Sequence, residues 1–548
     1  MDVGIEALRC QLRSAVEECS ARGLVFSTKW AAQQLCSLPA SLGTEGDNAM
    51  QSAGTPTLKH RLRGAASSSS SGRDDEDDGR ALDFAERDRL ALGKSLFDVR
   101  EFERAAFMLQ GCVGPRAVFL RMYARFLNSE RLGRSGAADQ AEITAELLAL
   151  DVAGALDAFG VYLLALALKA CRRRDEARDA CVRSVTAFEC NWSAWQLLAG
   201  VAGPQAAEVC PEGGWVRHVF LAQALTSSDS AAEFSGHLAA LERVFGRSGL
   251  VLGLQAQRHL RVREYEEAGA VFSDLQDLDP FGLELSDAHS HVLYATQDRG
   301  RLAVLAQRCA AVDRFRPETC VVIGNYYSLR GERDKAAGYF RRAVQLEPSS
   351  REAWVLLGHE LVELKNTSGA IDAYRHATEI DARDANAWYG LGQVYDMLNM
   401  PHFALRYFAR AAALCPHDSR MWSALGDCYG RSAQPDRAIA CYRRALHASP
   451  ESRAHAAVHL ARLYAAAGDR PRAAHCFRLL LANAASDAGD DVADACLFLA
   501  SFEVDRQNTR AARQYLAQVA DAAPYRAEEA SAMLRAMASA SEPADSHW

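Results

Sequence analysis

A repeat of 34 residues constrains this chain more than any other feature of its 548-residue sequence. Four copies follow one another without a gap, beginning at Pro317, Arg351, Ala385 and Ser419. Every copy has glycine at position 8 and alanine at position 20. These small residues are Gly324, Gly358, Gly392, Gly426, Ala336, Ala370, Ala404 and Ala438. A fixed period of this length indicates stacked structural units, each too small to bury its own apolar face.

The spacing inside each copy predicts a pair of helices. Positions 4, 7, 8 and 11 lie on one face of a first helix, and positions 20, 24 and 27 lie on one face of a second. Proline at position 32, as at Pro348, Pro416 and Pro450, ends the second helix. This period and pattern are those of the tetratricopeptide repeat (TPR). We therefore predict an all-α fold, a right-handed superhelical solenoid of tetratricopeptide repeats.

The rest of the chain is arranged around these regular copies. Weaker copies precede and follow them, and a Ser/Asp-rich stretch interrupts the chain near its beginning. This stretch has too few apolar residues to offset chain entropy, so we predict a disordered insertion there. The expected segments are an N-terminal helical hairpin at 1–38, the insertion at 39–80, degenerate repeats at 81–248, middle hairpins at 249–316, the four regular repeats at 317–452, C-terminal repeats with a capping helix at 453–538 and a disordered tail at 539–548.

The composition disfavours several classes of protein. A formal net charge of −8 gives no positive field to hold nucleic acid or anionic lipid. The longest apolar run, Phe159 to Leu168, is shorter than the roughly 20 residues that cross a bilayer, so we expect no membrane span. The 15 cysteines include no C-x-x-C pair, which favours free thiols in a reducing compartment. The first residues lack the order of a secretory signal, which favours the cytosol or the nucleus.

The sequence contains no recognisable catalytic motif. Phosphate-binding, zinc-protease, serine-hydrolase and kinase signatures are missing, and repeat hairpins account for almost every residue. His289, His291 and His359 have no companion at metal-ligand spacing on the same face, so we interpret them as structural or solvent-facing imidazoles. We expect a binding scaffold without cofactor, metal or catalytic residue.

The surface that such a scaffold would use follows from helix geometry. Positions 2, 5, 9, 12 and 13 of each first helix point away from its packing face, toward a groove suited to an extended peptide. The candidate groove is polar and acidic with aromatic patches, so it suits a basic segment that carries an aliphatic anchor. The predicted peptide-binding residues are Asn325, Ser328, His359, Glu363, Tyr389, Gln393 and Asp396.

Several stretches that the repeat does not dictate carry a resemblance. They include NWSAW at 191–195, IGNYYSLRG at 323–331 and GHELVELKNT at 358–367. Further stretches are CSARGLVFSTKW at 19–30, SLFDVREFERAA at 95–106, FLRMYARFL at 119–127 and AWYGLGQVYDML at 387–398. Through them the chain resembles the subunit 8 family of the anaphase-promoting complex (cyclosome), which are tetratricopeptide scaffolds of that ubiquitin ligase. The resemblance spans nearly the full length, apart from the insertion and the alanine-rich C-terminal part.

The resemblance implies a specific role in the cell cycle. It implies a nuclear and cytoplasmic protein that forms a homodimer through its N-terminal repeats, within about Met1 to Asp151, and stacks with other TPR and scaffold subunits. It also implies that the C-terminal groove receives the C-box, a short Arg-containing motif of Fizzy-type coactivators. Glu363 or Asp396 would then pair with the guanidinium, and Tyr389 would pack against its stem. Ubiquitin transfer itself would belong to other subunits.

Two other classes of protein remain as alternatives. A co-chaperone adaptor would clamp an acidic C-terminus with Lys, Arg and Asn, but Val321 and Glu352 occupy groove positions where such a ligand needs positive or amide groups. An enzyme with a repeat-built regulatory arm would need a non-repeat domain, and the sequence leaves no room for one. The observed pattern favours the scaffold.

Overall fold

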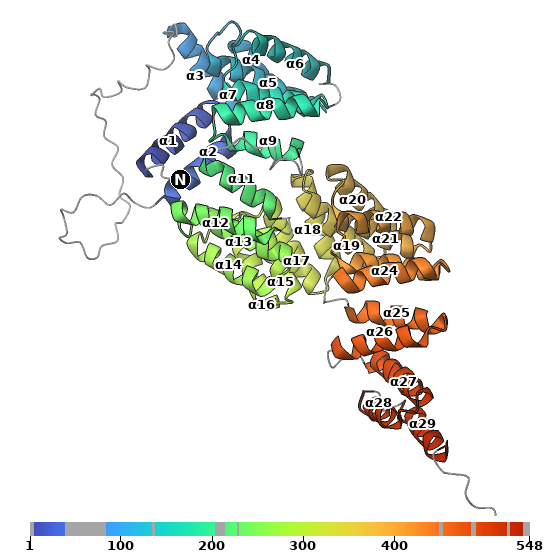
Figure 1. The fold of residues 1–548 in the computed structure, drawn as a ribbon. Coiled ribbons are helices and arrows are strands. Elements are labelled where there is room, and N and C mark those ends of the chain that lie inside the picture. Colours follow the sequence, from blue (N-terminus) through green and yellow to red (C-terminus); the bar gives the residue numbers. More distant parts are fainter. Residues whose placement is uncertain are drawn as a thin grey trace, which may run out of the picture. The chain divides into compact units, whose positions relative to one another are not determined.

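The computed structural model describes residues 5–38, 84–133, 137–202, 214–226, 230–448, 453–483, 489–522 and 526–540. Within these ranges the chain forms helices and no strand, and the predicted all-α tetratricopeptide-repeat solenoid is confirmed (Figure 1). No helix in these ranges has both the length and the apolar character needed to cross a membrane. The predicted insertion at 39–80 and most of the predicted tail at 539–548 lie outside the described residues.

The first compact unit covers Met1–Gly282. The apolar run Phe159–Leu168 lies in α7, which is buried on almost every side and forms the centre of this unit's core. The helices of the unit are α1 (Ile5–Ala21), α2 (Val25–Ser37), α3 (Phe84–Asp98), α4 (Phe102–Met108), α5 (Pro115–Leu132), α6 (Ala137–Val152), α7 (Ala158–Ala170), α8 (Arg174–Ala187), α9 (Trp192–Ala202), α11 (Trp215–Leu225), α12 (Ala231–Phe245), α13 (Gly249–Val262) and α14 (Tyr265–Leu278).

The N-terminal hairpin α1–α2 is part of this core, although it precedes the next described helix by a long stretch of sequence. Figure 1 shows α2 beside α9 and α11. The Trp30 ring of α2 stacks between Trp192, at 4.7 Å, and Trp215, at 5.4 Å between ring centroids. The buried Arg22 donates to Asp157 Oδ2 at 2.5 Å, just before α7. These contacts join the beginning of the chain to its middle.

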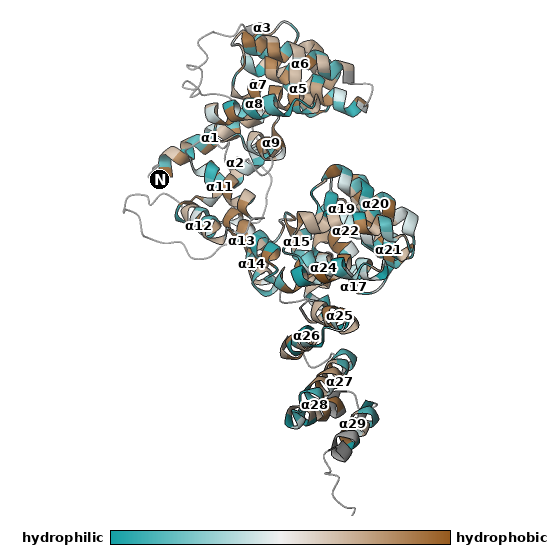
Figure 2. Cartoon of the chain, turned by 45° about the vertical axis from the view of Figure 1, so that its right-hand side comes forward, coloured by the Kyte–Doolittle hydropathy of each residue, from teal (hydrophilic) through white to brown (hydrophobic). Residues whose placement is uncertain are grey.

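The second unit, Leu283–Trp548, consists of consecutive helical hairpins. Its helices are α15 (Ser286–Ala295), α16 (Arg299–Val312), α17 (Pro317–Leu329), α18 (Arg333–Leu346), α19 (Arg351–Glu363), α20 (Thr367–Ile380), α21 (Ala385–Met397), α22 (Pro401–Leu414), α23 (Ser419–Arg431), α24 (Pro435–Ala448), α25 (Arg453–Ala466), α26 (Arg470–Asn483), α27 (Gly489–Asp505), α28 (Thr509–Ala522) and α29 (Ala527–Ala540). The division at Gly282 falls inside the expected block at 249–316, because α13–α14 belong to the first unit and α15–α16 to the second. Figure 2 shows apolar and hydrophilic residues side by side on the helices, as amphipathic packing requires.

Glycine at position 8 of the regular repeats permits a close contact between the two helices of a hairpin. A Cβ at Gly392 would lie 2.6 Å from the Phe408 ring, which is closer than Cβ atoms in proteins approach other side chains. The Tyr374 ring lies against two glycines, Gly358 of its own hairpin and Gly390 of the next. The other position 8 pairs are Gly324 with Phe340 and Gly426 with Tyr442. An aromatic ring therefore fills the space that a missing side chain leaves.

Tryptophan at position 4 fixes the turn that precedes its helix. In each case the indole Nε1 donates to the backbone carbonyl six residues earlier, a contact that we call the indole tie. The donor–acceptor pairs are Trp195 with Glu189 at 2.7 Å, Trp354 with Pro348 at 3.0 Å, Trp388 with Ala382 at 3.0 Å and Trp422 with Pro416 at 2.8 Å. The tie recurs in both units, so the same register holds in the degenerate copy that begins at α9.

Candidate functional site

The predicted groove residues on α17 point into the protein. Asn325 is buried, and its Nδ2 donates to Ser290 Oγ of α15 at 2.8 Å. Ser328 is also buried, and its hydroxyl donates to Glu360 Oε1 of α19 at 2.6 Å. Both side chains therefore connect neighbouring first helices, and their polar groups are committed to internal hydrogen bonds.

Glu360 is a buried carboxylate that the sequence analysis did not select. Only 6% of its side chain is exposed, and it pairs with Arg333 Nη1 at 3.2 Å in addition to Ser328. The equivalent positions of the other regular copies hold Tyr326, Val394 and Cys428. The sequence did offer a signal for Glu360, since it is charged where its counterparts are aromatic, apolar or weakly polar. A carboxylate at such a buried position needs a partner, so it indicates an internal ion pair or hydrogen bond.

The predicted residues on α19 lie at the surface. His359 reaches solvent, and its ring lies at 62° to the Tyr374 ring, with 5.7 Å between the centroids. Desolvation by the surrounding protein, followed by the charges of Arg420 and His291, lowers the pKa of His359 below its ordinary value. Glu363 is exposed and lies 3.9 Å from the nearest guanidinium nitrogen of Arg333.

The predicted residues on α21 line one pocket. This pocket has a volume of about 680 Å³, and Tyr389, Gln393 and Asp396 form one wall. Tyr389 packs against Phe408 at 5.6 Å between ring centroids, and burial raises the pKa of its hydroxyl. Asp396 forms an ion pair with Arg431 of α23. The other lining residues are Ala424, Asp427, Gly430, Tyr442, His455, His459, Arg462 and Leu463.

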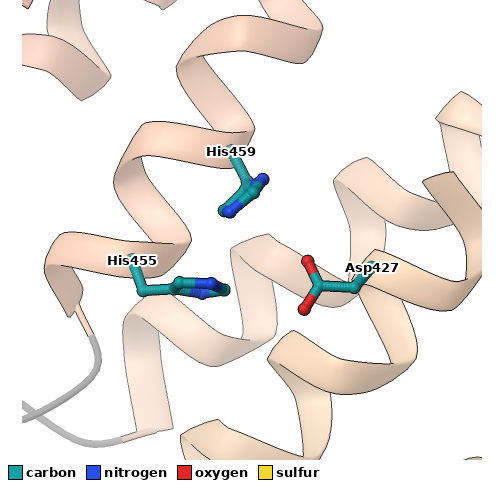
Figure 3. Close-up of side chains that lie close together, drawn as sticks. All are labelled: Asp427, His455 and His459. Atoms are coloured by element: carbon teal, nitrogen blue, oxygen red, sulfur yellow. The ribbon is translucent and has the colours of Figure 1, made fainter. Parts of the chain in front are cut away.

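The same pocket contains a cluster of possible metal ligands. Asp427 of α23 and the pair His455 and His459 of α25 each offer one ligand atom within 4.8 Å of the others (Figure 3). Sequence reasoning examined other histidines and missed these. The available signal was the spacing of His455 and His459, since residues four apart share one face of a helix. Asp427 occupies position 9, a predicted groove position, in the copy that begins at Ser419.

A second acidic region lies nearer the start of the second unit. Burial, followed by repulsion from Glu352 and Glu318, raises the pKa of Asp287 to about 6. Three successive first helices, α15, α17 and α19, thus each contribute a carboxylate to one acidic region, in which Glu352 is paired with Arg351 at 2.9 Å. Glu318 Oε2 is buried and has no hydrogen-bond partner. Such a region attracts cationic groups.

Comparison with known proteins gives matches along most of the chain. A family model described as Anaphase promoting complex subunit 8 / Cdc23 matches residues 7–139 and 140–256. Two tetratricopeptide-repeat models match residues 358–399 and 419–452.

Individual relatives extend these matches. Anaphase-promoting complex subunit 8 of Arabidopsis thaliana is 33% identical over 396 residues, which cover 67% of each chain. Anaphase-promoting complex subunit CDC23 of Saccharomyces cerevisiae is 27% identical over 449 residues, covering 67% of this chain and 71% of its own. Among solved structures, a chain of the APC/C hetero-tetramer Cut9–Hcn1 is similar with a TM-score of 0.49 and 16% identity, over 80% of this chain and 94% of that one.

Proposed function

Because the chain belongs to the anaphase-promoting complex subunit 8/Cdc23 family, we propose that it is a tetratricopeptide scaffold subunit of this E3 ubiquitin ligase. In this role the protein holds other TPR and scaffold subunits in the complex, a task that suits a series of helical hairpins, while ubiquitin transfer takes place elsewhere. Affinity purification of the tagged chain from dividing cells, followed by mass spectrometry, tests this role. Absence of other subunits of the complex from the eluate would contradict it.

The second part of the proposal concerns a coactivator. The observation that supports coactivator binding is the pocket wall formed by Tyr389, Gln393 and Asp396, because three of the predicted groove residues face one cavity. An Arg-bearing C-box peptide would replace Arg431 at Asp396, and the Tyr389 ring would pack along the aliphatic stem of the arginine. The acidic region of Asp287 adds long-range attraction for the same basic segment.

A binding titration with single variants tests this site. Fluorescence anisotropy of a labelled C-box peptide is measured against Asp396→Ala, Tyr389→Ala and Glu363→Ala. Loss of a carboxylate from a desolvated pair costs about 2–5 kcal/mol of binding free energy, whereas a charge at the rim mainly changes the association rate. Asp372→Ala, an exposed carboxylate on α20, is the matched control. Unchanged affinity in all three groove variants would remove this pocket from the proposal and leave the scaffold role intact.

The acidic region gives the binding a defined pH dependence. Asp287, with a pKa of about 6, is charged at pH 7.5 and mostly neutral at pH 5. The affinity for an Arg-bearing peptide should therefore fall as the pH is lowered through 6, and Asp287→Asn should flatten this profile. Anisotropy titrations at pH 7.5, 6.5 and 5.5 measure it. If the affinity of Asp287→Asn depends on pH as steeply as that of the wild type, Asp287 does not contribute to binding.

The third part of the proposal is a homodimer formed by the N-terminal repeats, within about Met1 to Asp151. Large apolar side chains are exposed there, including Phe26 at 81% and Phe107 at 68%. Such side chains are candidates for an interface. Phe26→Glu and Phe107→Glu should shift the mass in light scattering from dimer toward monomer, whereas Phe281→Glu, 76% exposed outside this range, should not. A monomeric wild-type chain at micromolar concentration would contradict the dimer.

The proposed role places the protein in both nucleus and cytoplasm. A fluorescent fusion imaged through one division cycle tests this distribution. Confinement of the fusion to a membrane-bound organelle other than the nucleus would contradict both the location and the assembly.

A further inference from the structure

The side chains of Asp427, His455 and His459 converge from two hairpins on one point of the 680 Å³ pocket. His455 and His459 lie one helical turn apart on α25, and their ring centroids are 4.4 Å apart. Asp427 faces them from α23, and one ligand atom of each residue lies within 4.8 Å of the other two (Figure 3). This separation is short enough for one ion to bridge all three after small side-chain rotations, since zinc–nitrogen and zinc–oxygen bonds measure about 2.0–2.2 Å.

Tyr442 holds two of the three side chains in place. Its hydroxyl donates to Asp427 Oδ1, and its ring stacks on the His459 ring with an interplanar angle of 9°. The hydrogen bond engages one carboxylate oxygen and leaves Oδ2 available. Supporting contacts of this kind orient ligands at metal centres.

The charges around the cluster permit a cation. Arg431 and Arg462 also line the pocket, but each is neutralised by carboxylates outside the cluster. Arg431 pairs with Asp396, and Arg462 contacts Asp491 and Asp494 at 2.8 Å each. His455 is exposed and the other two are partly exposed, so an ion reaches the cluster from solvent without a change of fold.

From this arrangement we propose that Asp427, His455 and His459 bind a divalent transition-metal ion of the Zn²⁺ class. Two imidazoles and one carboxylate suit Zn²⁺ and disfavour Mg²⁺ and Ca²⁺, which prefer all-oxygen sets. Three protein ligands leave a fourth position that faces the pocket, where water or a donor group of a bound peptide completes the tetrahedron. The ion connects hairpins α23–α24 and α25–α26.

Calorimetric titration of the full chain with Zn²⁺ alone, after chelator treatment and dialysis, tests the site. The wild type should bind one ion that His455→Ala/His459→Ala loses or binds at least 100-fold more weakly, and Mg²⁺ should give no binding. His218→Ala/His237→Ala is the matched control, because these histidines form another close pair, with Nδ1 atoms 2.8 Å apart in the first unit. Retention of full affinity in the first double variant, or loss in the control, would overturn the proposal, as would a wild type that binds no Zn²⁺.

A second variant separates ligand loss from misfolding. Tyr442→Phe keeps the ring against His459 and removes only the hydrogen bond to Asp427, so Zn²⁺ affinity should fall about 10–100-fold. Binding of Zn²⁺ to the native state should also raise the melting temperature of the wild type, and the chelator should reverse this rise. A Zn²⁺-induced rise of equal size in His455→Ala/His459→Ala would place the ion elsewhere and refute the assignment.

Discussion

Hairpins α21–α22 and α7–α8 cross at the same repeat positions with different side chains. In α21–α22 the crossing pairs Gly392 with the Phe408 ring, and a Cβ on the glycine would collide with the ring. In α7–α8 the equivalent positions hold Ala165 and Cys181, both fully buried. A small thiol leaves room for the alanine Cβ, whereas a ring does not. The two units thus preserve the close approach of the helices and not the identity of the residues, so the same substitution should have different effects in each.

The largest expected effect comes from filling the Gly392 position. Gly392→Leu places a branched side chain against Phe408 and should lower the free energy of unfolding by about 3 kcal/mol. Urea titration followed by circular dichroism measures the loss. Gly338→Leu is the matched control, since that helical glycine of α18 is exposed and a Cβ there meets nothing within 4 Å. Equal losses in the two variants would show that the repeat register is mistaken.

A smaller effect is expected from one methyl group. Gly392→Ala should cost about 2 kcal/mol, although alanine favours helix, because the added Cβ lies 2.6 Å from the ring. The double variant Gly392→Ala/Phe408→Leu should lose at least about 1 kcal/mol less than the sum of the single losses. Strict additivity in this cycle would mean that the two side chains do not compete for space.

The reverse change in the first unit should be milder. Ala165→Gly in α7 removes a Cβ that the crossing accommodates, so it should cost about 1 kcal/mol through lost helix propensity. Urea titration monitored in parallel with Gly392→Ala measures it. Stabilisation by this change would indicate that the crossing in α7–α8 is as crowded as that in α21–α22.

The smallest effect is expected at Tyr374. Its ring fills the space between Gly358 and Gly390, but its buried hydroxyl has no hydrogen-bond partner. Tyr374→Phe should therefore leave stability unchanged or raise it by up to about 1 kcal/mol. Tyr442→Phe is the comparison, because its hydroxyl donates to Asp427 and its loss should cost about 1 kcal/mol. A marked loss at Tyr374 would reveal an additional contact of that hydroxyl.

The regular part of the fold could be predicted because its contacts repeat. Gly358 contacts Tyr374 16 residues later, and Gly392 contacts Phe408 at the same separation. The 34-residue period therefore predicts which residues pack together in each regular copy. The stacking of Trp30 between Trp192 and Trp215 belongs to no period. Contacts over such separations depend on how whole hairpins fit together, which a one-dimensional pattern does not encode.

The candidate site could be predicted only in part for a related reason. Helix geometry placed Asn325 and Asp396 on the same face, but it takes no account of the next hairpin. Asn325 is covered through its contact with Ser290, whereas Asp396 remains at the pocket. The register of the repeat shifts by one residue before His455 and His459. The regular pattern therefore did not predict that these two side chains lie close to Asp427.

The indole ties make the junctions between hairpins mechanically unequal. Three successive junctions in the second unit are fastened by Trp354, Trp388 and Trp422, but position 4 of the copy in α25 is Ala457, which has no donor. Bending stiffness should therefore drop at the step from α24 to α25, and a pulling force should open that step before the tied ones. The ligands of the proposed ion lie on either side of this untied step, so a bound ion would replace the missing tie.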